Sequence, residues 1–203
     1  MSSVEEAIDA LVAGLPVVIP TDTVYGLAVD PARAGATDRL FDIKERPLDA
    51  ALPVLAADRD QAFSLAEDVS DVARTLADRF WPGGLTLVIP RRRDLDFDLG
   101  GSDGATIGVR VPNHAVPQLI ATRVGPIAAT SANLHGRPTP ETADGVVAEL
   151  GDHVSIVVDG GRCAGAASTV VACTGDEITI LREGRVAREA IERALGPRHP
   201  PIR

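Results

Sequence analysis

The sequence predicts an α/β fold in which a twisted, mostly mixed sheet is flanked by helices. Short apolar runs that suit buried strands alternate along the chain with segments whose apolar residues recur at helical spacing. Glycine and proline stand at many of the boundaries between them. Since 203 residues with 45% hydrophobic content are enough for one core, we expect a single domain over residues 1–203, with a disordered tail at 196–203.

The first half of the chain is expected to open with a helix over residues 3–13, which leads into a buried strand over Leu15–Pro20. The strand ends in a polar loop at Thr21–Thr23, at the position where α/β sheets bind ligands. The amphipathic segment Ala36–Lys44 is predicted to be helical, which places Lys44 at a helix exit. The further elements expected here are strands over 52–57 and 85–90 and helices near 60–66 and over 71–81.

The second half begins with a long exposed loop over 91–105. Residues 106–112 alternate in character, so we expect a strand with Thr106, Gly108 and Arg110 on one face. Thr139 followed by proline is a good helix start and predicts a helix over 139–150 with Thr139 as its cap. The remaining expected elements are helices near 115–122 and over 188–195 and strands over 126–130, 155–159, 167–172 and 177–181.

Composition excludes several classes of protein. No apolar run approaches the about 20 residues that a membrane-spanning helix needs, and the N-terminus is unlike a signal peptide, so we expect a cytoplasmic protein with no membrane partner. The net charge of −9 argues against a protein that mainly binds nucleic-acid phosphates. The two cysteines, Cys163 and Cys173, and four scattered histidines fit no metal-site spacing, and we predict no metal centre.

Standard nucleotide-binding motifs are missing, but short polar clusters follow apolar strands or helices at several points. Each cluster alone is best explained as an ordinary solvated loop. Together, cations and hydroxyls converging on one sheet edge would suit a small anionic ligand, with phosphates or a carboxylate as its charged groups. The clusters are Thr21/Asp22/Thr23, Lys44/Arg46, Arg110, Ser131/Asn133, Ser168/Thr169 and Arg182.

These residues resemble the YrdC-like threonylcarbamoyl-AMP synthases in their short, single-domain form, and the matching motifs follow the family order over almost the whole chain. The pair formed by KxRP and SxN is the most specific. The resemblance implies a YrdC-like fold with a concave ligand-binding surface. The motifs are Pro20-Thr21-Asp22-Thr23-Val24-Tyr25-Gly26-Leu27, Lys44-Glu45-Arg46-Pro47, Trp81-Pro82-Gly83-Gly84-Leu85-Thr86, Val109-Arg110-Val111-Pro112, Ser131-Ala132-Asn133, Ser168-Thr169-Val170-Val171 and Arg182-Glu183-Gly184.

The same resemblance implies a nucleotidyltransferase that converts L-threonine, bicarbonate and ATP into threonylcarbamoyl-AMP and pyrophosphate. The product would serve the t6A modification of adenosine 37 in tRNA, with tRNA and t6A-transfer proteins as possible partners. Lys44 and Arg46 are the implied catalytic residues because they would hold phosphates. The implied ATP-binding residues are Lys44, Arg46, Thr106, Ser131, Asn133, Thr139 and Arg182, and the implied threonine-binding residues are Thr23, Arg110 and Ser168.

The chemistry implied by this resemblance needs positioning and charge neutralisation more than a nucleophilic side chain. Mg²⁺ would be held mainly by ATP and water. If a proton acceptor is required, Asp22 is the candidate, and the substrate itself is the alternative.

Two alternative functions stay open. Some members have an asparagine and a histidine where this chain has Ala50 and Leu55, so a paralogue that makes a carbamoyl-adenylate is one alternative. A YrdC-like RNA-binding protein without this activity is the other, since the basic triplet Arg91–Arg93 could meet RNA. Dependence on ATP and on threonine would separate the three.

Overall fold

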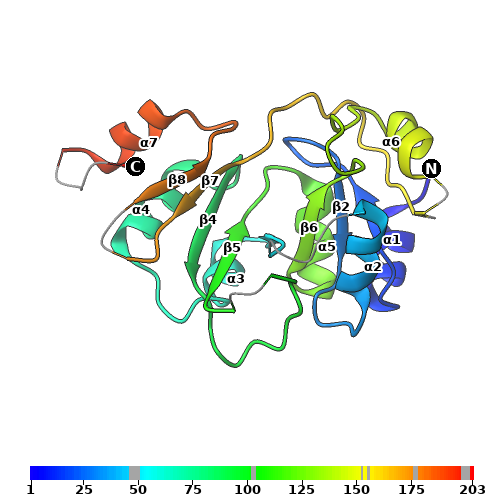
Figure 1. Cartoon of the computed structure of the whole chain (residues 1–203), viewed down its shortest axis with the longest axis horizontal. Coiled ribbons are helices and arrows are strands. Elements are labelled where there is room, and N and C mark those ends of the chain that lie inside the picture. The colour runs from blue at the N-terminus through cyan, green and yellow to red at the C-terminus, as the bar shows by residue number, and fades with distance from the viewer. Residues whose placement is uncertain (46–50, 102–103, 152, 155, 176–177, 198–201) are drawn as a thin grey trace.

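The computed structural model describes residues 1–45, 51–101, 104–151, 153–154, 156–175, 178–197 and 202–203. Within these residues eight strands form one mixed sheet in the order β1-β2-β6-β3-β5-β4-β7-β8, which confirms the predicted α/β class (Figure 1). The pairs β3–β5 and β4–β7 are parallel and the other neighbours are antiparallel. The strands are β1 (Val17–Ile19), β2 (Gly26–Val29), β3 (Val54–Leu55), β4 (Leu85–Pro90), β5 (Thr106–Arg110), β6 (Ile127–Ser131), β7 (Thr169–Ala172) and β8 (Thr179–Arg182).

Helices lie at both ends of the sheet, and the two chain termini lie at opposite ends of the molecule (Figure 1). Two helices have the predicted bounds, because an amphipathic pattern and a clear stop define each of them. None of the described helices is both long and apolar enough to span a membrane. The helices are α1 (Val4–Val12), α2 (Ala36–Lys44), α3 (Arg59–Phe63), α4 (Asp71–Phe80), α5 (Ala115–Val124), α6 (Ala143–Leu150) and α7 (Arg188–Leu195).

Alternation along the strands divides the buried apolar residues between the faces of the sheet. On β1, Val17 and Ile19 belong to a smaller core shared with α1 and α5, whereas Val18 belongs to the main core. On β5, Ile107 and Val109 are buried in the main core. The other face of β5 therefore remains available for polar residues, as the alternating sequence predicted.

Strand β2 is the main element that the sequence analysis missed. No element was assigned to its residues, but β1 and β2 form a hairpin in which Ile19 pairs with Gly26. Four buried residues without a turn signal of their own gave too short a pattern to identify the strand. The hairpin makes the Thr21–Thr23 loop a tip that pairing with β6 holds against the centre of the sheet.

The start of α6 is also different from the prediction. Thr142, and not Thr139, caps this helix by accepting a hydrogen bond from the Gly145 amide. The hydroxyl of Thr139 instead donates to Asn133 Oδ1 at 3.2 Å. A tertiary partner therefore replaces the local capping role that the Thr-Pro sequence predicted.

One further expectation needs correction. Among the described residues of the expected strand over 155–159, Val157 and Val158 form only isolated bridges, to Val18 and Ser2 respectively. In the tail, the Arg203 amide donates to the Ile178 carbonyl at 3.0 Å, and the disorder expected over 196–203 stays a prediction. Residues 198–201 of the predicted disordered tail lie outside the described residues.

The described part of the loop over 91–105 contains neither a helix nor a strand, as predicted, but it is not fully exposed. Leu99 is buried against the main core. Arg91 donates to the carbonyl oxygens of Leu95 at 3.1 Å and Phe97 at 2.5 Å, so the first arginine of the basic triplet stabilises its own loop. Arg92 forms an ion pair with Asp94.

Candidate functional site

A cavity of about 380 Å³ brings together residues from seven strands, β2 to β8, and from the loops next to them. The outward residues of β5 form part of its floor, which confirms the predicted face with Thr106, Gly108 and Arg110. The residues that line it are Thr21, Thr23, Val24, Gly26, Ala51, Pro53, Leu55, Thr86, Val88, Thr106, Gly108, Arg110, Ala129, Thr130, Ser131, Ala167, Ser168, Val170, Leu181 and Arg182.

The guanidinium of Arg110 is fixed in this cavity by three hydrogen-bonding contacts. Its Nε donates to the Gly83 carbonyl at 2.9 Å, Nη1 donates to Thr23 Oγ1 at 3.0 Å, and Nη2 lies 2.5 Å from Asp22 Oδ1. Only 7% of the Arg110 side chain and 12% of the Asp22 side chain are exposed. Gly83 belongs to the turn between α4 and β4, and Thr23 to the β1–β2 hairpin, so two distant loops fix the guanidinium.

Burial lowers the pKa of Arg110, and the nearby Asp22 carboxylate acts in the opposite direction. The cationic side chains of Arg185 and Arg182 contribute to the lowering. Arginine stays protonated at physiological pH despite such shifts. Arg110 therefore presents a rigid cation at the cavity wall, which suits the planar carboxylate of a ligand.

Ser168 joins two other strands to the site. Its hydroxyl lies 2.8 Å from Thr86 Oγ1 on β4, and Arg182 Nη2 donates to Ser168 Oγ at 3.1 Å. Arg182 also donates twice to the Ser168 carbonyl, at 2.9 and 3.1 Å. Burial lowers the pKa of Arg182 as well. A second arginine, Arg182 of β8, thus lies at the cavity and is held there by its hydrogen bonds to Ser168, just before β7.

Ser131 reaches the cavity because β2 pairs with β6. Gly26 is the partner of Ser131 in this register, and the next residue, Ala132, donates its amide to the Tyr25 carbonyl at 2.8 Å. A Cβ on Gly26 would lie 3.6 Å from the Thr130 carbonyl oxygen. The end of β6 and the Thr21–Thr23 loop are therefore side by side.

Lys44 lies behind Ser131 and is not one of the residues that line the cavity. Its side chain is buried, and Nζ donates to the Ser131 carbonyl at 2.7 Å, to Asn133 Oδ1 at 3.1 Å and to the Asn133 carbonyl. Asn133 Oδ1 also accepts from Thr139. These four residues thus form one hydrogen-bonded group at the end of β6.

Most of the predicted site residues fall into two groups. Thr23, Thr106, Arg110, Ser131, Ser168 and Arg182 line the cavity, while Lys44, Asn133 and Thr139 support the end of β6. Arg46 and Ala50 lie outside the described residues. Thr169 is fully buried and bonds to Val186, so it does not face the cavity.

Sequence reasoning missed two contributions to the site. Thr86 was noted only as part of a motif, although alternation on β4 could have placed it beside the Ser168 segment. The Gly83 carbonyl is a backbone group without any residue-type signal, and only the fold shows that it holds Arg110. Leu55, at which the sequence analysis noted a departure from the family pattern, does line the cavity.

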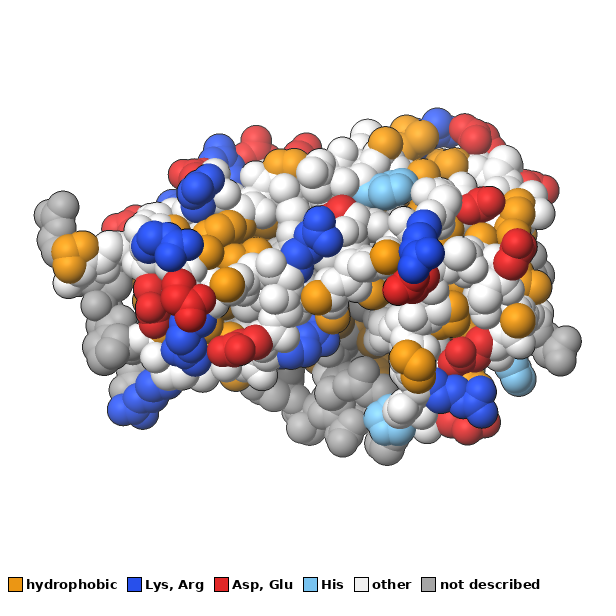
Figure 2. Space-filling view, turned by 90° about the horizontal axis from the view of Figure 1, so that it is seen from above, with side chains coloured by type: hydrophobic (Ala, Val, Ile, Leu, Met, Phe, Trp, Pro, Cys, Tyr) orange, Lys and Arg blue, Asp and Glu red, His pale blue; other side chains and the backbone are white. Residues whose placement is uncertain are grey.

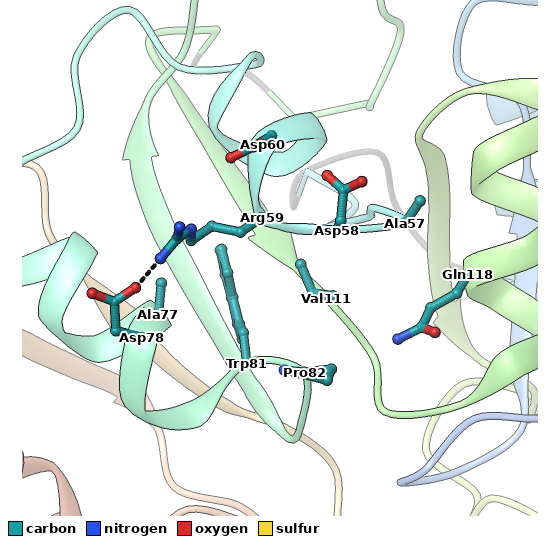
Figure 3. Close-up of a pocket in the computed structure, with 10 residues that line it drawn as sticks. All are labelled: Ala57, Asp58, Arg59, Asp60, Ala77, Asp78, Trp81, Pro82, Val111 and Gln118. Atoms are coloured by element: carbon teal, nitrogen blue, oxygen red, sulfur yellow. Dashed lines mark hydrogen bonds and ion pairs between the residues drawn. The ribbon is translucent and has the colours of Figure 1, made fainter.

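A second cavity of about 490 Å³ lies elsewhere, between α3, the end of α4 and α5 (Figure 3). Figure 3 shows Arg59 and Asp78 facing each other as an ion pair, with the Trp81 ring nearby. Asp58 and Asp60 add two further carboxylates. Because these acids would repel phosphates and carboxylates, the smaller cavity with its arginines is the better candidate site for an anionic ligand.

Within the part of the chain that the structure describes, no group of three or more histidine, cysteine or acidic residues could hold a metal ion. The two cysteines are buried, and burial raises the pKa of Cys173 to about 12.

The family model described as telomere recombination, Sua5_yciO_yrdC, matches residues 9–184. The chain is 38% identical to the threonylcarbamoyl-AMP synthase of Bacillus subtilis over 90% of its length, and 39% identical to the putative threonylcarbamoyl-AMP synthase of Mycobacterium tuberculosis over 94%.

The chain spans 54% of the B. subtilis protein and 88% of the M. tuberculosis protein. Among solved structures, the crystal structure of P. abyssi Sua5 complexed with L-threonine superposes with a TM-score of 0.89 at 34% identity. That match covers 98% of this chain and 58% of the P. abyssi chain. The match of the family model over most of the sequence and the close relatives together show that this chain belongs to the Sua5/YciO/YrdC family.

Proposed function

We propose that this protein is a nucleotidyltransferase that condenses L-threonine, bicarbonate and ATP into threonylcarbamoyl-AMP and releases pyrophosphate. The observation that carries the proposal is the single cavity in which a carboxylate-binding arginine, Arg110, and a second arginine, Arg182, lie with several hydroxyl groups. The similarity to named threonylcarbamoyl-AMP synthases and to a Sua5 bound to L-threonine supports this assignment. The product would serve the t6A modification of tRNA in the cytoplasm, with t6A-transfer proteins and tRNA as its later partners.

Threonine would bind at the end of the cavity formed by Thr23, Arg110 and Ser168. The guanidinium of Arg110 offers a planar, charge-assisted contact for the α-carboxylate. Thr23 Oγ1 already bonds to Arg110, so it would contact a ligand held there. Ser168 belongs to the same cavity and could bond to the substrate's hydroxyl or to its carbamate.

ATP would occupy the part of the cavity lined by Thr106, Ser131 and Arg182. Arg182, at the end of β8, would neutralise phosphate charge. Arg46 lies outside the described residues, and its binding of phosphate stays a prediction. Lys44 Nζ donates hydrogen bonds to the Ser131 carbonyl and to both oxygens of Asn133 at the end of β6. Its proposed phosphate contact therefore requires the ammonium to exchange at least one of these acceptors for a phosphate oxygen.

The reaction itself takes place in two steps, each of which forms one bond and breaks another. The threonine nitrogen attacks the carbon of bicarbonate, and loss of water gives the carbamate. A carbamate oxygen then attacks the α-phosphorus of ATP, and the bond to the bridging oxygen of the β-phosphate breaks to release pyrophosphate. This chain would contribute by holding the reactants close together and by neutralising charge with arginines.

Mg²⁺ would be held mainly by the phosphates and by water, and it would neutralise phosphate charge during the transfer. Asp22 was proposed above as a proton acceptor. Its Oδ1 is engaged by Arg110 Nη2 and would have to leave that contact before it could accept a proton. The second proton acceptor considered, the substrate itself, needs no such rearrangement.

The RNA-binding alternative finds less support. Two arginines of the basic triplet, Arg91 and Arg92, bond to groups of the protein itself. On the face that Figure 2 draws, Lys and Arg side chains are interspersed with Asp and Glu and form no continuous basic surface. Phosphate contacts dominate nonspecific nucleic-acid binding, and they need such a surface.

The experiment that tests the proposal measures pyrophosphate release from ATP with bicarbonate and Mg²⁺, with and without L-threonine, and with L-serine for comparison. We expect release that depends on threonine. The Arg110→Ala variant should require much more threonine, whereas Arg59→Ala, in the second cavity, should behave like the wild type.

Release that is independent of threonine but depends on carbamoyl phosphate would favour the carbamoyl-adenylate alternative. A folded protein that releases no pyrophosphate under any of these conditions would contradict the proposed enzymatic activity and would favour the RNA-binding alternative.

A further inference from the structure

We propose that Asp22 makes the cavity selective for α-amino acids over simple carboxylate anions, by offsetting the charge of Arg110 and attracting the ammonium group of the ligand. This inference rests on the proposed function, because it concerns the end of the cavity where threonine would bind. Asp22 is thereby a specificity-determining residue of the site.

Arg110 lines the cavity, and Asp22 pairs with it from a position next to the lining residues. Asp22 Oδ1 is 2.5 Å from Arg110 Nη2, and both side chains are almost fully buried. Thr21 and Thr23, the neighbours of Asp22, both line the cavity. The Thr21 hydroxyl donates to the Val24 carbonyl at 2.6 Å and accepts from the Val24 amide, so the loop that carries Asp22 is tied to itself.

A ligand carboxylate on Arg110 must lie beside Asp22. Of the five N–H donors of a guanidinium, three are directed at Gly83 O, Thr23 Oγ1 and Asp22 Oδ1. An incoming carboxylate can use the remaining donors or displace Asp22, and in either position two carboxylates share one cation. At a site with little exposure to water, that repulsion is stronger than it would be in solution.

An α-amino acid relieves this repulsion, because its ammonium group is on the carbon next to its carboxylate. Because Asp22 contacts Arg110 directly, a carboxylate bound to Arg110 would bring the ammonium near Asp22, where the opposite charges attract. A ligand with the same skeleton but no amine lacks this compensating charge. The Arg110–Asp22 pair thus matches the two charges of an amino acid.

Two further arginines near Arg110 increase the positive charge that Asp22 offsets. Arg182 and Arg185 act electrostatically on Arg110. A Cβ added to Gly165 would lie 2.9 Å from Arg185 Nη1 and 2.6 Å from the Thr23 carbonyl, which places that guanidinium beside the same loop. Without Asp22, the three arginines would attract carboxylate, phosphate and bicarbonate alike.

The test compares two ligands by titration calorimetry: L-threonine and (R)-3-hydroxybutyrate, which is threonine without its amine. The wild type should bind threonine more tightly by about tenfold or more, as expected for a charge-assisted contact. In Asp22→Asn, threonine should bind more weakly and hydroxybutyrate more tightly, so the preference disappears. Asp22→Glu keeps the charge and should keep most of the preference.

A matched control is Asp78→Asn, which removes the carboxylate of the Arg59–Asp78 pair in the second cavity and should leave both affinities unchanged. Circular dichroism checks that each variant is folded. If Asp22→Asn does not fold, the affinities of the wild type for the two ligands still test the proposal, because equal affinities would overturn it.

Three results would refute the role of Asp22. Asp22→Asn could weaken both ligands equally, which would mean that Asp22 only holds Arg110 in place. The variant could instead keep the preference of the wild type for threonine. Finally, a folded wild type that binds no threonine would refute the proposed function itself, whereas the first two results would leave that function standing.

Discussion

The buried ammonium of Lys44 should be a major source of stability for the end of β6. Lys44→Met keeps the length and much of the apolar surface of the side chain but removes the donor for three oxygens of Ser131 and Asn133. Hydrogen bonds to a charged group contribute roughly 1.5–3 kcal/mol each, and they are not additive. Since methionine also removes the cost of burying a charge, we expect a net loss of about 3 kcal/mol in the free energy of unfolding.

Urea unfolding followed by circular dichroism measures this loss. We expect a lower midpoint with an unchanged slope, because the same surface is exposed on unfolding. The matched control is Arg39→Met on the same helix, whose side chain is exposed and donates to the Gly14 carbonyl at 2.6 Å. Loss of that single contact should cost at most about 1 kcal/mol.

A Lys44→Met variant that is as stable as Arg39→Met, or more stable, would refute this prediction. Such a result would mean that the ammonium does not make the three contacts. A variant that loses the expected stability yet releases pyrophosphate with an unchanged ATP requirement would show that Lys44 supports β6 without binding phosphate.

Three further predictions concern other parts of the molecule. Burial lowers the pKa of His114 below 6.5, so folding favours the neutral imidazole, and stability should fall as the pH drops below about 6.5. His114 Nδ1 accepts from the Val116 amide, and His114→Asn should keep this cap but remove that pH dependence in urea unfolding at several pH values. The buried Cys163 and Cys173 should resist a thiol reagent at pH 8 until urea is added, and rapid labelling of either in the native protein would contradict their burial. Ser168→Ala should raise the KM for threonine about tenfold in the pyrophosphate assay, and an unchanged KM would remove Ser168 from the threonine site.

Local signals in the sequence determined the elements that carry the site. The amphipathic pattern of Ala36–Lys44 and its stop fix a helix with the predicted bounds, and the alternation over 106–110 fixes which side chains of β5 face outward. These features could be predicted because they depend on neighbours within one or two turns of chain. The motif order also indicated the family that the comparisons confirm.

Only the tertiary structure decided which of these groups contact one another. Asp22 and Arg110 are 88 positions apart, and Lys44 and Asn133 are 89 apart, so no local pattern could show either pair. The same long-range pairing buries the lysine that the sequence places at a helix exit and takes Thr139 away from its predicted helix cap. Pairing of β2 with β6 brings the Thr21–Thr23 loop beside Ser131, because strand register is set by the burial of a whole sheet face.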